Sequence, residues 1–392
     1  MQIVSAASQH VETSQAVVQV LEQVQTELAG TDPDFLALFV TTEHTSRFAT
    51  ITRSLRDVWP DACLIGCGAA SVIGGGHEIE SGPGISLLAL RWPGVTFAPF
   101  HLTAEDIAAA VEQPDSLRQQ IGGGAAEPAC VLLLSDPFSL GADALLPILD
   151  WALPETAVLG GVASGATAPG QTALAAGDHF TTEGLVGVSL QGGIEVETVV
   201  AQGCRPIGAP LFVTSSHDGV ISTLDGRPPM EILEELFEAG DARERALLQS
   251  SLSLGIQMEA GRNAYGHGDF LVRNLVAVDE ERGAIAVSSA IEPNDVVQFH
   301  LRDAHTASED LQLALRRHTR LRERLRGALL FSCLGRGEGL YGVADHDTNL
   351  LRGQLGPVPV AGFFGHGEIG PVTGRTYLHA YTSAFGLLCE PA

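Results

Sequence analysis

The alternation of apolar and polar stretches along this chain follows a pattern that occurs three times. In its first occurrence, an apolar run at Phe35–Thr41 precedes a polar turn, an amphipathic helix to about Val58 and a second apolar run at Cys63–Ser71. After a glycine-rich loop, a third apolar run follows at Ile85–Trp92. Continuous apolar runs that alternate with helices are typical of strands buried on both faces. The pattern therefore predicts a strand-helix-strand-strand unit.

The same order recurs twice further along the chain. The second unit has its strand, helix, second strand and return strand at 129–137, 141–152, 157–165 and 185–190. The third unit has them at 327–337, 343–353, 358–370 and 381–389. Aligned without gaps, the three second strands place Gly66, Gly160 and Gly362 at one position. A glycine there fits a sharp turn or a close backbone approach, and we interpret the units as copies of a common ancestor.

The segments around these units predict further helices and hairpins. Helical spacing covers 11–28, 104–121, 230–240 and most of 302–326, while hairpins are expected across 218–219 and 279–283. A stretch around residues 191–210 divides the chain. We therefore predict a mixed α/β protein with two lobes of mixed β-sheet covered by helices. Our preferred arrangement is two mixed sheets packed face to face, with one lobe from each half.

Charge and composition narrow the class of partner. The net charge is −25, and all 22 basic residues are arginine. Nucleic-acid binding requires clustered cations, so we exclude it. The absence of lysine rules out Schiff-base chemistry and a P-loop lysine. An arginine-, alanine- and glycine-rich composition without lysine is typical of a high-GC bacterial proteome. The chain begins without a secretory signal pattern and no apolar run has transmembrane length, so we expect a cytoplasmic protein without membrane insertion.

Several motifs resemble the FIST family in both its N-terminal and C-terminal halves. They are LIGCGAAS, QGCRPIG, VTSSHDGVISTLDGRPPMEIL, FLVRNLVAVDEERGAIAVSS, CLGRG and GFFGHGEIGP, at 64–71, 202–208, 213–233, 270–289, 333–337 and 362–371. The resemblance implies a FIST N-terminal-like domain at 1–200 and a FIST C-terminal-like domain at 201–392. It also implies a ligand-sensing module proposed to bind small molecules such as amino acids. The first unit departs from the family pattern, since Gly68 replaces a serine and Ser71-Val72 replace a glycine-glutamate pair.

The CLGRG motif is the first candidate for ligand contact. Cys333, Arg336 and Gly337 follow a predicted buried strand, where flanking glycines let backbone amides and a guanidinium converge on one anion. An arginine fork suits a carboxylate, because it can bind both oxygens. The structural alternative is that Arg336 pairs with an internal carboxylate such as Glu368. Cys333 is also the best nucleophile candidate, although no signature supplies its base.

The matching exit of the next strand carries His366, Gly367 and Glu368. Ligands of open α/β sheets bind at strand C-terminal ends, where Glu368 could receive an ammonium group and His366 could donate or accept a hydrogen bond. The alternative for Glu368 is a carboxylate that caps nearby amides. Arg273 lies among apolar residues of a hairpin strand, where a salt bridge is favoured over ligand contact. We expect no metal and no cofactor.

Three functions remain compatible with these residues. The preferred one is a small-molecule sensor, in which an amino-acid-like ligand spans Arg336 and Glu368 between the lobes and a separate signalling partner receives the output. The second is a protein-interaction scaffold whose acidic surface binds a basic partner. The third is a cysteine-dependent enzyme that uses Cys333, and we leave enzymatic activity uncertain with no catalytic residue assigned.

Overall fold

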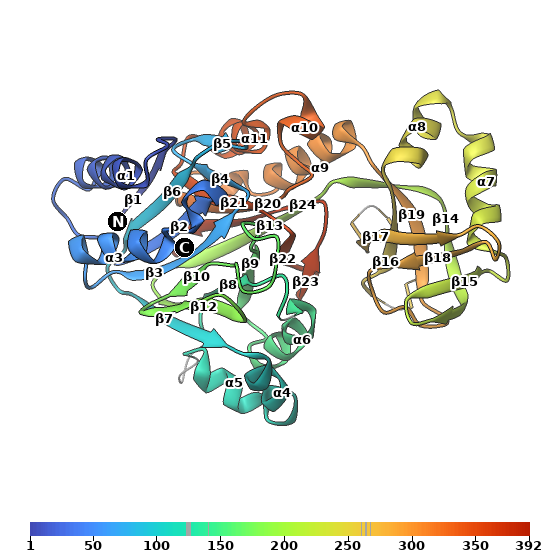
Figure 1. Cartoon of the computed structure of the whole chain (residues 1–392), viewed down its shortest axis with the longest axis horizontal. Helices are drawn as coiled ribbons and strands as arrows, with labels where there is room; N and C mark the ends of the chain where they lie inside the picture. Colours follow the sequence, from blue (N-terminus) through green and yellow to red (C-terminus); the bar gives the residue numbers. More distant parts are fainter. Residues whose placement is uncertain (123–126, 140, 260, 263–264, 267) are drawn as a thin grey trace. The chain divides into compact units, whose positions relative to one another are not determined.

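The computed structural model describes residues 1–122, 127–139, 141–259, 261–262, 265–266 and 268–392. The chain forms two compact units (Figure 1). The larger comprises Met1–Val200, Leu311–Leu378 and Thr382–Ala392, and the smaller comprises Ala201–Asp310 with His379–Tyr381. The mixed α/β class with several mixed sheets is confirmed. The expected domains at 1–200 and 201–392 remain a prediction about the family domains, because these units are divided differently.

The three predicted units each form the centre of a six-stranded mixed sheet in the larger compact unit. In every sheet the first and second strands are parallel and the return strand is antiparallel to the first. In the first repeat these strands are β2 (Phe35–Thr41), β3 (Cys63–Ala69) and β6 (Ile85–Arg91). In the second they are β8 (Cys130–Ser135), β9 (Ala157–Val162) and β12 (Leu185–Gly192). In the third they are β20 (Leu325–Cys333), β21 (Val360–Gly365) and β24 (Thr382–Cys389).

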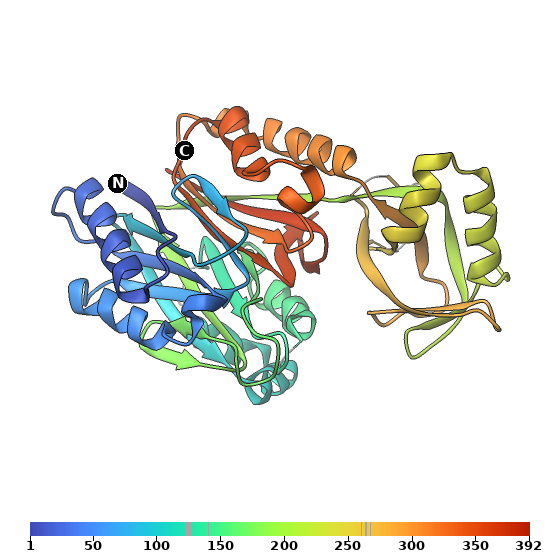
Figure 2. The same cartoon turned by 45° about the horizontal axis from the view of Figure 1, so that its top comes forward.

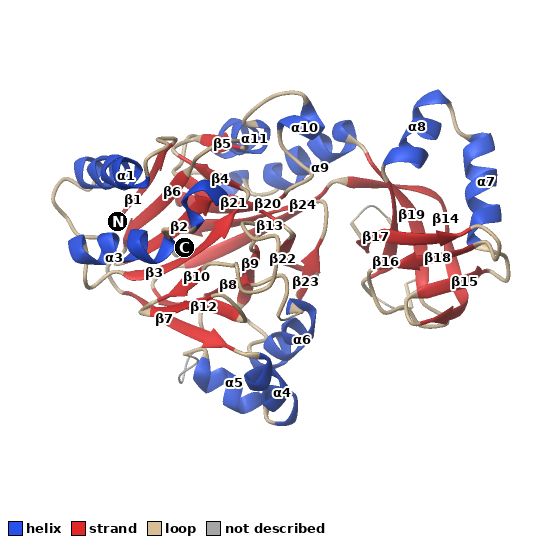
Figure 3. Cartoon of the chain, in the orientation of Figure 1, coloured by secondary structure: helices blue, strands red, loops and turns tan. Residues whose placement is uncertain are grey.

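Each repeat begins with one further edge strand and contains helices that cover its sheet. The edge strands β1 (Gln2–Ser8), β7 (Val95–Leu102) and β13 (Glu195–Gln202) lie beside β6, β12 and β24. The helices of the first two repeats are α1 (Thr13–Glu27), α2 (Thr42–Thr45), α3 (Phe48–Val58), α4 (Ala104–Glu112), α5 (Pro114–Gln120) and α6 (Ala142–Ala152). Those of the third are α9 (Ala304–Arg316), the 3-10 helix η1 (Thr319–Leu321), α10 (Glu338–Tyr341) and α11 (His346–Leu355). The helices of the larger unit lie outside its strands (Figures 2 and 3).

The repeats exchange hairpins, which the sequence pattern does not predict. The hairpin of the first repeat, β4 (Ser71–Gly74) and β5 (His77–Ile79), extends the third sheet through β21. The hairpin of the second, β10 (Leu174–Ala176) and β11 (His179–Thr181), extends the first sheet through β3. The hairpin of the third, β22 (Gly367–Val372) and β23 (Arg375–His379), extends the second sheet through β9. Each sheet is therefore completed by another repeat.

The main hydrophobic core lies where the three sheets face one another. It joins buried residues of all three repeats, and the Phe39 ring lies 6.3 Å from that of Phe331 and 5.2 Å from that of Phe363. The second strands end at this core. Ser164 there accepts a hydrogen bond from the backbone amide of Ala70 and donates one to the carbonyl of Phe364. One serine thus connects the strand ends of three repeats.

The smaller unit contains a closed barrel in the order β14-β15-β18-β17-β16-β19. In sequence, it is inserted into the third repeat between β13 and α9. Its strands are β14 (Cys204–His217), β15 (Val220–Leu224), β16 (Leu252–Gln257), β17 (Phe270–Asp279), β18 (Ala284–Val287) and β19 (Val296–Arg302). Its helices are α7 (Pro229–Ala239) and α8 (Ala242–Ser250). The predicted hairpin turn at Asp218-Gly219 is confirmed, with positive φ at both residues.

Two expectations were wrong in detail. The described chain has three open sheets and a barrel instead of two face-to-face sheets. The helix expected over 104–121 is two helices, because Pro114 lacks the N–H that a continuous helix requires. The expectation that most of 302–326 is helical is confirmed by α9 and η1, and β20 begins at Leu325. No helix in the described ranges combines the length and hydropathy needed to cross a membrane.

Candidate functional site

Most of the predicted site residues lie together at two adjacent strand ends of the third sheet. Strands β20 and β21 are parallel, and Cys333 at the end of β20 is in register with Gly365 at the end of β21. The loop after β20 therefore carries Arg336 beside the turn from which Glu368 enters β22. Both residues belong to the larger unit. The expected placement of the site at strand C-terminal ends thus agrees with the geometry.

Arg336 is fully buried and forms an ion pair with Asp347 of α11. Its Nε donates to Asp347 Oδ2 at 3.0 Å and its Nη2 to Oδ1 at 3.2 Å. Burial alone would lower the pKa of the guanidinium, but the Asp347 carboxylate outweighs that effect and raises the pKa. Burial likewise acts to raise the pKa of Asp347, yet Arg336 and hydrogen bonds from His346 and Ser383 hold it below the ordinary range. Both groups are therefore charged near neutral pH.

Two stacked aromatic rings also contact this ion pair. The Tyr341 ring stacks on the His346 ring with centroids 3.4 Å apart and an interplanar angle of 9°. The Arg336 guanidinium lies 5.5 Å from the Tyr341 centroid, within the range of a cation–π contact. His346 Nδ1 lies 2.8 Å from Asp347 Oδ1. The guanidinium is consequently fixed in orientation by a carboxylate and a ring.

The CLGRG loop does bind a carboxylate at its backbone, and that carboxylate belongs to Glu80. Both carboxylate oxygens of Glu80 accept hydrogen bonds from the Glu338 amide, at 2.8 and 2.9 Å. Gly337 has φ +74°, and a Cβ at this position would lie 2.3 Å from Glu80 Oε2. The backbone conformation therefore requires glycine here, and a side chain would also displace the Glu80 carboxylate from its present position. Glu80 follows β5 of the exchanged hairpin, so the first repeat supplies this contact.

Glu78 of the same hairpin brings a second carboxyl group to the first turn of α11. Its Oε1 accepts a hydrogen bond from the Thr348 amide at 2.7 Å, while its Oε2 is buried without a partner among the described residues. Burial, followed by the nearby Asp347 carboxylate, raises the pKa of Glu78 to about 8. Asp345 holds the hairpin by accepting from the Glu78 amide at 2.6 Å. The surroundings of Arg336 are thus rich in carboxyl groups.

Glu368 is fully buried at the start of β22. Its Oε2 accepts a hydrogen bond from the Thr382 amide at 3.2 Å, and its Oε1 has no hydrogen-bond partner within the described ranges. Burial raises the pKa of Glu368 well above its ordinary value, although the Thr382 amide and the positive charge of Arg336 act against it. A buried oxygen without a partner is costly, so this carboxyl group favours its protonated form and retains capacity for a polar contact.

The remaining predicted residues differ in exposure and location. His366 is exposed, whereas Cys333 is half-buried and its sulfur accepts a weak contact from the Gly335 amide at 3.5 Å. Gly367 pairs with Val162 of the second sheet. Arg273 is a buried residue of β17 in the smaller unit, where its Nη1 donates to the Val272 carbonyl at 3.3 Å. The structure therefore groups six predicted residues in one unit and Arg273 in the other.

Sequence reasoning missed the internal partners of Arg336 and its loop. The internal pairing considered for Arg336 named Glu368, but its carboxylate partner is Asp347. The positions of Glu78 and Glu80 could have indicated these partners. The two residues lie two apart after the glycines at 74–76, so both fall on one face if this segment is a strand. Nothing local shows that this strand joins the third sheet. The resulting cluster presents buried charges that suit contact with a small polar molecule.

Comparisons with known proteins match most of the chain. The family model of the FIST N domain matches residues 34–227, and that of the FIST C domain matches 229–371. An uncharacterized protein of Mycobacterium bovis is 37% identical over 386 residues, covering 96% of each chain. An uncharacterized protein of Mycobacterium tuberculosis is 37% identical over 378 residues, again covering 96% of each. A cyanuric acid hydrolase from A. caulinodans aligns over 100% of both chains at 9% identity and a TM-score of 0.39, a likeness too weak to support an argument.

Proposed function

The chain belongs to the FIST family, and we propose that it is a cytoplasmic sensory protein that binds a small amino-acid-like molecule and signals through a separate protein partner. FIST domains are associated with sensing in signal transduction. The proposal assigns ligand contact to the strand ends that carry Arg336 and Glu368, with Cys333, Gly337, His366 and Gly367 around them. Arg273, for which the sequence favours a salt bridge over ligand contact, is retained as a further candidate.

The observation that supports this proposal best is the state of Glu368. A fully buried carboxyl group with one oxygen left without a partner is a position where a ligand group recovers a missing hydrogen bond. Arg336 contributes a positive charge, and its ion pair with Asp347 fixes the orientation of the guanidinium. An amino acid has groups for both positions, since its ammonium suits Glu368 and its carboxylate is attracted by Arg336.

A thermal-shift screen of amino acids, small carboxylates and nucleotides tests the proposal. A ligand at about 100 times its Kd stabilises the native state by roughly 2.7 kcal/mol, which raises the Tm by several degrees. We expect Glu368→Gln to abolish this shift while the protein stays folded, because glutamine matches the shape of a protonated glutamate. Asp136→Asn is the matched control: it neutralises another buried carboxylate of the larger unit, lowers the Tm itself and keeps the ligand-induced shift.

Proton release gives an independent measurement for any amine ligand found in the screen. Burial raises the pKa of Glu368 and an ammonium group beside it lowers that pKa, so binding releases a proton at any pH where the unliganded carboxyl group is protonated. Calorimetric titrations in two buffers of different ionisation enthalpy measure that proton. We expect release with the wild type and none with Glu368→Gln. A flat screen with a well-folded protein would overturn the proposal in favour of an interaction scaffold without a small ligand.

A further inference from the structure

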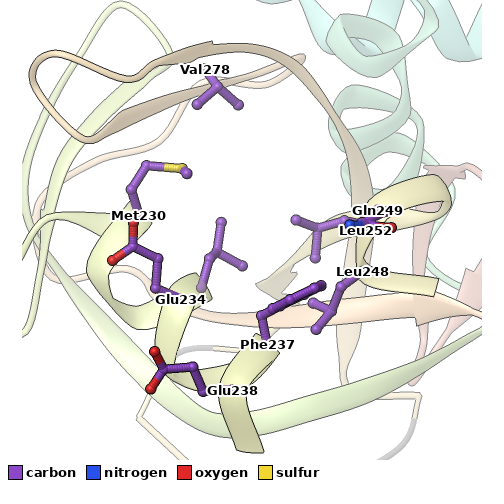
Figure 4. Close-up of a pocket in the computed structure, with 9 residues that line it drawn as sticks. Met230, Glu234, Phe237, Glu238, Leu248, Gln249, Leu252 and Val278 are labelled. Atoms are coloured by element: carbon purple, nitrogen blue, oxygen red, sulfur yellow. The ribbon is translucent and has the colours of Figure 1, made fainter. Parts of the chain in front are cut away.

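The smaller unit contains an apolar cavity that the site above does not use. Its volume is about 370 Å³, and it lies between α7, α8, the start of β16 and the end of β17. In Figure 4, Met230, Leu252 and Val278 lie on three sides of it. A volume of this size is at the lower end of the range for small-molecule sites, which occur preferentially at places such as the mouths of β-barrels.

The lining of this cavity is apolar and only part of it belongs to the barrel core. Leu233 and Leu248 are each 9% exposed and pack in the core, whereas Phe237 is 36% exposed and Val278 is 48% exposed. Side chains that leave this much apolar surface in contact with water around a concave space favour an apolar ligand, because binding removes that surface from water. The cavity thus suits a short hydrocarbon chain.

Charge at one side of the cavity selects the head group. Glu234 and Glu238 line it from the same helix, α7, and both are exposed. Within the part of the chain that the structure describes, neither carboxylate takes part in an ion pair. The other two acids of this helix differ, since Glu231 and Glu235 both pair with Arg227. Two carboxylates one helical turn apart beside an apolar cavity favour a cation over an anion, and the Arg245 guanidinium, which donates to the Phe237 and Glu238 carbonyls, offsets part of this preference.

We propose that this cavity binds a small cationic amphiphile, with its hydrocarbon chain between Leu233, Leu252 and Val278 and its ammonium or guanidinium group beside Glu234 and Glu238. The site is separate from Arg336 and Glu368, so this proposal does not depend on the sensory site proposed above. Its binding has two parts that respond differently to conditions. The apolar part is insensitive to ionic strength, whereas the contact with two exposed carboxylates weakens as salt rises.

Three probes with one chain length and different head groups test the proposal on the full-length protein. Calorimetric titration is performed with decylamine, decanol and decanoate below their aggregation limits. We expect decylamine to bind about tenfold more tightly than decanol, with decanoate weakest, as two exposed ion pairs imply. The preference of decylamine over decanol decreases between 0.05 and 0.5 M salt in this experiment because exposed charges are screened, with a Debye length of about 10 Å at 0.1 M.

Matched variants on α7 distinguish a specific contact of the head group with Glu234 and Glu238 from a non-specific effect of the negative charge of the helix. Glu234→Gln combined with Glu238→Gln should remove most of the preference for decylamine, while Glu231→Gln combined with Glu235→Gln should leave it within about twofold. Val278→Phe fills the cavity from an exposed strand position that tolerates the larger ring, and should weaken all three probes at least tenfold. Equal binding of decylamine and decanoate, or unchanged binding to Val278→Phe, would overturn the proposal.

Discussion

The guanidinium of Arg336 and the carboxylate of Asp347 form two hydrogen bonds, at 3.0 and 3.2 Å, with side chains that are 1% and 2% exposed. The pair connects the loop after β20 to the first turn of α11. Ser332 and Ser383 also hydrogen-bond Asp347, from β20 and β24. A buried charge pair with this many neighbours fixes the geometry of the strand ends at which we propose the ligand site.

Removing one partner of this pair should be strongly destabilising. We expect Arg336→Ala to lower the free energy of unfolding by about 3–5 kcal/mol, because it leaves the Asp347 charge buried without its partner. Replacing both residues with leucine should cost less than the single change. Urea denaturation of the two variants measures the difference. An Arg336→Ala protein within about 1 kcal/mol of the wild type would show that the pair is unimportant for stability.

The carboxyl group of Glu78 should contribute stability that is lost as pH rises between about 4.5 and 8. Burial and the neighbouring Asp347 raise the pKa of Glu78 from an ordinary 4.5 to about 8, so the folded chain binds a proton in this window that the unfolded chain does not. The free energy of unfolding then decreases with pH, by up to about 1.4 kcal/mol per pH unit for one such group. Glu80 and Glu368 have raised pKa values as well and act with the same sign.

The variant Glu78→Gln isolates the contribution of Glu78 to the pH dependence of the free energy of unfolding. Its unfolding free energy, measured by urea titration at pH 5.5, 6.5 and 7.5, should decrease less steeply with pH than that of the wild type. A residual slope is expected from the other two carboxyl groups. Parallel slopes for the two proteins would mean that Glu78 titrates at its ordinary pKa.

Gly337 should be sensitive to alanine substitution for a reason that Gly342 does not share. Both have a positive φ, but Gly342 lies in the left-handed helical region with ψ 10°, where a side chain costs about 1–2 kcal/mol, whereas Gly337 has ψ −157°, a conformation that essentially only glycine adopts. In addition, the new Cβ at Gly337 would meet the Glu80 carboxylate, since the described residues leave the space around Gly342 open. We expect Gly337→Ala to be the more destabilising in thermal denaturation. Adding Glu80→Ala should recover the part of the loss that comes from the carboxylate, and an unchanged loss in the double variant would contradict the contact.

Ser164 should contribute more to the free energy of unfolding than an ordinary buried serine does. Ser164→Ala leaves the Ala70 amide and the Phe364 carbonyl without their partner, which costs about 1–3 kcal/mol. Ser189→Ala is the control, because Ser189 is also buried but its hydroxyl donates only to the Ile121 carbonyl. Chemical denaturation of both variants gives the comparison. The connection between the repeats is refuted if Ser164→Ala is no more destabilising than the control.

Sequence reasoning succeeded where the determinants are local. The aligned Gly66, Gly160 and Gly362 predicted a close backbone approach, and a Cβ at each would lie within 2.3 Å of a carbonyl oxygen on the neighbouring parallel strand. Repeat boundaries followed from the same apolar runs. The partner of Arg336 was not predictable in this way, because the helical pattern of 343–353 does not show which face of that segment meets the sheet. Pairing of β4 with β21 was also hidden, since a strand does not encode in its own residues the sheet that it joins.

The hairpin exchange gives this polypeptide the contacts of a strand-swapped trimer whose three subunits have been joined into one chain. Subunits of a homotrimer have the same sequence, whereas repeats within one chain can differ. A substitution at one contact between repeats is therefore not repeated at the other two contacts. The residues after the first strand of each repeat show the result: Thr42 and Glu43 follow β2, Asp136 and Pro137 follow β8, and Leu334 and Gly335 lead to Arg336 after β20. The three equivalent positions thus carry different side chains, and the third leads to the arginine that pairs with Asp347.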